Sequence, residues 1–217
     1  MPNWCDNTVE LYHEDPKMID RAVDALNRGE FLQEFIPVPE SLQIVAGRVG
    51  DDTDEAQKKL EEDTARNLAT HGYGNWYDYC VNEWGTKWDV GQEGAQTRDD
   101  ANRVTATFES AWAPPINAYE KLLDLGFEVR AYYYEPGMAF AGIWDNGDDD
   151  FYEIGGYTSE TIKEAIPESL DEMFAISEGM AEWEEENADE DDEDETPHEF
   201  ATPGSFTIEE GLKDKKE

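Results

Sequence analysis

The chain has 217 residues, of which 54 are acidic and 16 basic, so its formal net charge at neutral pH is −38. This charge argues against direct nucleic-acid binding, because neutralising phosphates requires clustered lysine and arginine. No stretch reaches the roughly 18–20 apolar residues of a membrane span, and no charged leader followed by an apolar run opens the chain. We therefore expect a cytoplasmic protein with no membrane association.

The cysteines and histidines show no metal-binding pattern. Cys5 and Cys80 lie in unrelated contexts, and their separations from His13 and His71 match no usual ligand spacing. We expect reduced, buried thiols, no metal and no cofactor.

The first part of the chain predicts a strand that leads into an amphipathic helix. Residues 7–13 alternate apolar and polar side chains, which is typical of a strand with one buried face. Asp15 and Pro16 suit the N-cap and first position of a helix, and Gly29 suits its end. Residues 31–50 contain two prolines and two glycines and predict an extended connection.

A helical insertion is predicted at about residues 51–85. Residues 52–70 are polar, with a thin apolar stripe that includes Leu60 and Leu68. The aromatic segment 72–91 follows, in which Trp76, Cys80 and Trp84 recur at the spacing of one helical face.

The remaining elements alternate between strands and helices. The patterns predict a short strand over 86–90, a polar loop over 92–102, a strand over 103–112, a helix between Pro115 and Gly126, strands over 127–134 and 138–144, and a hairpin turn at Asn146-Gly147 leading into 151–154.

This order predicts an α+β fold of the ferredoxin-like type. Two β-α-β units that cross back over one antiparallel sheet form the split β-α-β arrangement. We expect this domain to span residues 1–157, followed by an acidic helical extension over 158–186 and a disordered acidic tail over 187–217. The reason is charge: between residues 145 and 195 there are 22 acidic residues and one base, Lys163, and such a run buries too little apolar surface to fold by itself.

Several separated motifs resemble a known family. They are the opening Met-Pro-Asn-Trp-Cys-Asp-Asn, Asn75-Trp76-Tyr77, the segment 84–89, the corner 111–115, and the turn 134–137 leading to Phe140 and Gly142. Together they resemble phage and conjugative-plasmid proteins with a YubB-type ferredoxin-like domain. The resemblance covers about residues 1–157. It implies a mobile-element origin, a bacterial host cytoplasm and a ferredoxin-like fold, and it implies no catalytic set.

Our first functional hypothesis is a non-enzymatic protein whose carboxylates imitate the charge of nucleic acid. Such a protein would occupy the DNA cleft of a host DNA-binding protein, as a counter-defence factor does, and bind it quickly and salt-dependently. The candidate contact residues are those expected on ordered elements: Asp148, Asp149, Asp150, Glu153, Glu164, Glu168, Asp171 and Glu172. The alternative interpretation is that the acidic residues only solvate the chain or adapt it to high salt.

The second hypothesis is a small-molecule site or enzyme centred on segment 72–91. Its candidate pocket residues are Trp76, Tyr77, Lys87 and Trp88, and nearby titratable groups are Asp78, Glu83 and Asp89. No nucleophile–base pair or phosphate-binding loop supports an enzyme, and Lys87 is expected to pair with a neighbouring carboxylate. A scaffold or oligomerisation module is the third option.

Overall fold

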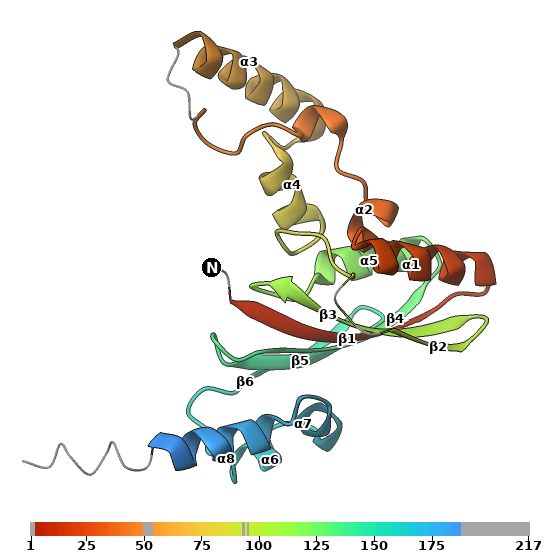
Figure 1. The fold of residues 1–217 in the computed structure, drawn as a ribbon, viewed down its shortest axis with the longest axis vertical. Helices are drawn as coiled ribbons and strands as arrows, with labels where there is room; N and C mark the ends of the chain where they lie inside the picture. The colour runs from red at the N-terminus through yellow and green to blue at the C-terminus, as the bar shows by residue number, and fades with distance from the viewer. Residues whose placement is uncertain (1–2, 50–53, 93, 95, 188–217) are drawn as a thin grey trace, which may run out of the picture.

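We describe a computed structural model of the chain, which covers residues 3–49, 54–92, 94 and 96–187. Its centre is one sheet of six antiparallel strands in the order β2-β3-β1-β4-β5-β6 (Figure 1). The strands are β1 (Trp4–Tyr12), β2 (Gln96–Asp100), β3 (Arg103–Ala111), β4 (Glu128–Glu135), β5 (Phe140–Asp145) and β6 (Asp148–Glu153).

Helices lie on both faces of this sheet. They are α1 (Pro16–Arg28), α2 (Phe31–Phe35), the 3-10 helix η1 (Glu40–Leu42), α3 (Asp54–His71), α4 (Trp76–Glu83), α5 (Ile116–Asp124), α6 (Ile162–Ala165), α7 (Glu168–Phe174) and α8 (Ile176–Asn187). Helices α1 and α5 cover one face, α6 to α8 lie on the other, and α3 projects away from the sheet (Figure 1).

The topology confirms the predicted fold class. The strands β2-β3-β1-β4, connected through α1 and α5, form an α+β fold with the split β-α-β order. The β5–β6 hairpin adds two strands beside β4. Its turn is the predicted Asn146-Gly147, with φ values of 49° and 108° that suit the tightest hairpin turn.

The main core lies between the sheet and helices α1 and α5. Because side chains alternate across a strand, Val104, Ala106 and Phe108 all point to this side, as predicted. Helix α1 begins with Asp15 as N-cap and Pro16 as first residue and ends at Gly29, also as predicted. These local signals position the helix that covers the sheet.

A second core holds the C-terminal helices against the opposite face. Ile162 of α6, Ile166 just after it and Leu170 of α7 are buried in one cluster with Tyr132 and Ile143 of the sheet. The acidic helices are therefore fixed to the sheet by apolar contacts. The predicted tail lies outside the described residues apart from Asn187, which ends α8.

The structure corrects several of these predictions. Residues 86–90 form no strand, and the edge strand lies instead at Gln96–Asp100, inside the predicted loop 92–102. The connection 31–50 contains α2 and η1 instead of being extended throughout. In α3 the stripe is incomplete, because Leu68 is 52% exposed on a helix that stands away from the sheet.

Candidate functional site

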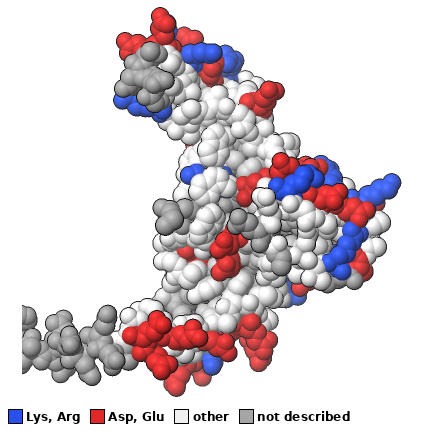
Figure 2. Space-filling view, in the orientation of Figure 1, with Lys and Arg blue, Asp and Glu red and all other residues white. Residues whose placement is uncertain are grey.

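The first candidate site is the acidic layer, which we define as residues 145–187. It contains 15 acidic residues and one base, Lys163. Figure 2 shows carboxylates gathered over α6 to α8, whereas acidic and basic side chains alternate around α1. The carboxylates of α6 to α8 thus form a dense acidic surface on one side of the sheet.

The eight candidate contact residues lie on two parts of this layer. Asp148, Asp149, Asp150 and Glu153 are exposed on the edge strand β6, while Glu164, Glu168 and Glu172 are exposed and Asp171 half-buried on α6 and α7. Charges on an edge strand also discourage pairing with another chain. The helical carboxylates are therefore the more informative part of the set.

Two of the eight carboxylates are engaged within the chain. Asp149 accepts a 2.7 Å hydrogen bond from the Tyr133 hydroxyl, and burial together with this bond raises the pKa of Tyr133. Asp171 accepts bonds of 2.7 Å from both the backbone amide and the hydroxyl of Ser177. Within the described chain, the other six make no hydrogen bond or ion pair through their side chains, so they remain accessible to a partner.

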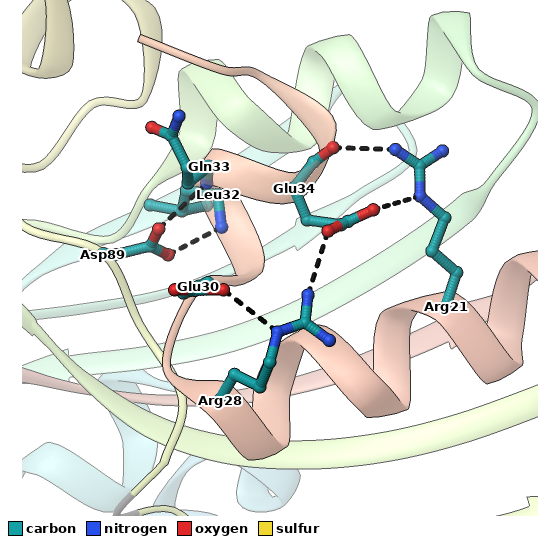
Figure 3. Close-up of polar contacts among 7 residues, drawn as sticks. All are labelled: Arg21, Arg28, Glu30, Leu32, Gln33, Glu34 and Asp89. Atoms are coloured by element: carbon teal, nitrogen blue, oxygen red, sulfur yellow. Dashed lines mark hydrogen bonds and ion pairs between the residues drawn. The ribbon is translucent and has the colours of Figure 1, made fainter.

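The carboxylates beside α1 are compensated, in contrast to the acidic layer. Glu34 lies 2.5 Å from Arg21 and 3.0 Å from Arg28, and Arg28 also pairs with Glu30 at 3.0 Å (Figure 3). The hydrogen bond from Arg21, reinforced by the charge of both arginines, holds the pKa of Glu34 below its ordinary value. The basic residues are thus concentrated away from the acidic layer.

The second candidate site is an aromatic cluster around Lys87. Its ammonium nitrogen lies 4.4 Å from the ring centroid of Trp88, 5.4 Å from that of Trp112 and 5.8 Å from that of Tyr77. These are cation–π distances. Trp4 extends the cluster, with its ring centroid 5.8 Å from that of Trp88.

The structure therefore joins three of the four predicted pocket residues. The fourth, Trp76, packs on the main core and contacts the edge of Tyr77. The expectation that Lys87 pairs with a carboxylate is wrong for the described chain, in which its ammonium contacts aromatic rings instead.

Backbone contacts hold the aromatic cluster in place. The Thr86 hydroxyl donates to the Ala111 carbonyl at 3.1 Å and accepts from its amide at 3.0 Å. The next residue, Trp112, adopts a positive φ of 69° and donates its amide to the Asn3 carbonyl at 2.9 Å. Such a conformation persists in a non-glycine residue only where its surroundings impose it.

The titratable groups of segment 72–91 have structural partners. The side chain of Asp78 bonds to that of the α4 N-cap Asn75, and Glu83 pairs with Lys121. Asp89 accepts from the amides of Leu32 and Gln33 at the start of α2, at 2.7 and 2.9 Å (Figure 3). Each of the three carboxylates therefore has a partner within the chain.

The two thiols are buried and free of disulfide bonds. Burial raises the pKa of both Cys5 and Cys80 to about 12, with a smaller contribution from nearby carboxylates. Both are protonated at neutral pH and are poor nucleophiles. Among the described residues, no group of His, Cys, Asp and Glu is placed to hold a metal ion.

The sequence did not indicate a groove on the sheet face that α6 to α8 cover. It has a volume of about 610 Å³, and the side chains that line it include Trp4, Asp6, Thr8, Glu109 and Phe174. Trp4, Asp6 and Thr8 alternate along β1 and therefore lie on one face of the strand. This alternation predicts a shared face, but it does not predict which residues of other elements pack opposite that face.

The fold and these surfaces define an acidic α+β protein built on a six-stranded antiparallel sheet, with no membrane-spanning helix in the part of the chain described. No family model and no curated protein matches the chain. Among solved structures it is similar to protein api92 from Yersinia pseudotuberculosis, of the family DUF1281, with a TM-score of 0.39 and 14% identity over 72% of this chain and 100% of that one. The resemblance to YubB-type proteins and their mobile-element origin stays a prediction.

Proposed function

We propose that this protein is a non-enzymatic binding protein that presents the acidic layer to a basic protein surface, in the place that nucleic acid would otherwise take. The observation that carries the proposal is the ratio of 15 acidic residues to one base on elements that the second core fixes to the sheet. An acidic tail used only for solvation needs no such anchoring.

The physical basis is electrostatic imitation. Duplex DNA carries one charge per about 1.7 Å of its axis. Carboxylates on short, anchored helices also provide a dense negative field, and binding through them does not require a flexible segment to become ordered. Such a field accelerates encounter with a cationic cleft and weakens as salt screens it. The partner is thus expected to be a DNA-binding protein.

The biological setting follows from the sequence resemblance to mobile-element proteins. A phage or plasmid gains from blocking a host restriction, recombination or immunity protein that acts on DNA. We therefore propose a counter-defence role in the cytoplasm of a bacterial host.

The test uses capture from host lysate followed by competition. The immobilised full chain should retain DNA-binding proteins at low salt and release them at roughly 0.5 M salt, where the screening length is only a few ångström. A short DNA duplex should compete with the chain for each captured protein. Capture that DNA does not displace contradicts the proposal.

Matched variants separate a specific surface from total charge. The triple variant Glu164→Gln, Glu168→Gln, Glu172→Gln changes exposed helical carboxylates that have no bonded partner in the described chain. It should lose most of the capture. The control changes the same number of exposed carboxylates on α3 to glutamine, at Glu55, Glu61 and Glu62, and should retain capture. Equal loss in both variants would show that only net charge matters.

A further inference from the structure

The groove beside β1 contains two carboxylates that face each other. Asp6 and Glu109 are direct cross-strand partners in β1 and β3, and both are exposed and line the groove. Like charges directly opposite each other destabilise a sheet. Within the described chain, no side chain forms a hydrogen bond or ion pair with either carboxylate.

Other carboxylates on the same sheet face do have cationic partners. Glu10 lies 3.8 Å from Arg103, and Asp145 lies 3.7 Å from Arg130. Within the described chain the Asp6–Glu109 pair has no such cation, which is also true of Asp148 and Asp150 of β6, but of these only Asp6 and Glu109 line the groove. The partial burial of Asp6 also raises the pKa of its carboxyl.

A hydroxyl that opens into the groove lies next to this pair. Thr8 follows Asp6 on the same face of β1, lines the groove and is only 7% exposed. Its hydroxyl makes no hydrogen bond to any residue that the structure describes. Because Thr8 lines the groove, this hydroxyl is open to a hydrogen bond with a molecule bound there.

Aromatic side chains provide the apolar part of the site. Trp4 and Phe174 both line the groove, and the Trp4 side chain is 43% exposed. The ring of Trp4 is 5.8 Å from that of Trp88, which itself contacts the Lys87 ammonium at 4.4 Å. The adjoining cluster thus already binds an alkylammonium from the chain itself.

We propose that this groove binds a small organic amine in its protonated form. Asp6 and Glu109 balance its charge, the Thr8 hydroxyl oxygen accepts a hydrogen bond from one of its N–H groups, and Trp4 and Phe174 contact its carbon atoms. The volume of about 610 Å³ lies within the range of small-molecule sites, which is about 300–1,000 Å³. This activity goes beyond the proposed protein binding and uses none of its eight contact residues.

The test is a titration of the isotope-labelled full chain followed by NMR, at constant ionic strength. The probes are n-butylammonium, tetramethylammonium and neutral 1-butanol. Both cations should shift the amide signals of residues in the groove, and 1-butanol should not. Equal shifts from 1-butanol, or from sodium ions at the same concentration, would overturn the proposal.

Variants then assign the contacts. Asp6→Asn with Glu109→Gln keeps the side-chain shapes, removes the repulsion and should raise the Kd for n-butylammonium at least ten-fold. The control Asp148→Asn with Asp150→Asn removes the same charge from the same sheet face outside the groove and should leave the Kd unchanged. An unchanged Kd in the first variant refutes the site.

Thr8→Val tests the hydroxyl with a side chain of the same shape. It should weaken the binding of n-butylammonium, which has N–H groups, more than that of tetramethylammonium, which has none.

A lysine peptide, acetyl-Gly-Lys-Gly-amide, tests whether the groove instead binds a protein side chain. Binding of the peptide without binding of n-butylammonium would contradict the proposal of a small amine. Loss of lysate capture by the helical triple variant has no bearing on these titrations.

Discussion

Gly142 of β5 lies directly beneath the ring of Tyr133 on β4. A Cβ atom at Gly142 would come within 2.1 Å of the Tyr133 hydroxyl oxygen and 2.2 Å of the ring carbon that carries it. The two residues are cross-strand partners, and the missing side chain lets the tyrosine extend over β5 to Asp149 of β6. This contact connects the main core to the acidic edge strand.

We predict that Gly142→Ala destabilises the protein by about 1–3 kcal/mol, because the methyl group forces a buried ring to move. Urea unfolding measures the change. Gly179→Ala on α8 is the control, since nothing lies within 4 Å of its position, and it should be neutral or stabilising by up to about 1 kcal/mol. Equal unfolding midpoints for the two variants would show that Tyr133 does not occupy this position.

We predict that Trp84→Ala costs about 3–5 kcal/mol, as for other buried aromatic residues. Trp84 is 4% exposed, and its indole nitrogen donates to the Ile36 carbonyl at 2.9 Å. The matched control is Trp183→Ala, because this indole is 66% exposed, and it should change stability by less than about 0.5 kcal/mol. A small loss for Trp84 would mean that its indole faces solvent.

We predict that Asp89→Ala destabilises the start of α2 by about 1–2 kcal/mol, because its carboxylate acts as a helix cap. It accepts from the amides of Leu32 and Gln33 and from its neighbour Val90. Asp89→Asn, which keeps one acceptor oxygen, should cost less. Thermal unfolding ranks the variants, and equal melting temperatures for wild type and Asp89→Ala would exclude this role.

The same residue predicts a pH dependence. Burial raises the pKa of Asp89 above its ordinary value, against the opposing effect of its hydrogen bonds. The folded state therefore holds the proton more tightly than the unfolded state, and stability is lost as pH rises from the ordinary value of about 4 through the raised pKa. The free energy of unfolding, measured across this interval, should fall more in wild type than in Asp89→Asn. Parallel curves would show that the pKa is not raised.

We predict that neither cysteine reacts with iodoacetamide in the native protein at pH 8. Both thiols are buried, and burial raises their pKa to about 12, so little thiolate is present. Mass spectrometry should show two labels only after unfolding in urea. Rapid native labelling of Cys80 would show that α4 opens to solvent.

Local signals in the sequence were sufficient for much of the fold. The cap at Asp15, the stop at Gly29 and the turn at Asn146-Gly147 depend on backbone conformations that neighbouring residues impose, and all three are confirmed. The edge strand was misplaced for the opposite reason. Gln96–Asp100 is polar and pairs only with β3, so its strand conformation depends on a partner rather than on its own pattern.

The sequence alone determined the charge excess, the alternation of β1 and β3, and the gathering of aromatic residues in segment 72–91, since each is a property of neighbouring positions. Tertiary structure decided that the acidic helices dock on the sheet, that Lys87 lies among aromatic rings, and that Asp6 faces Glu109. The reason is register: β1 and β3 are separated by about 90 residues of chain, and only their pairing brings two distant carboxylates to the same place.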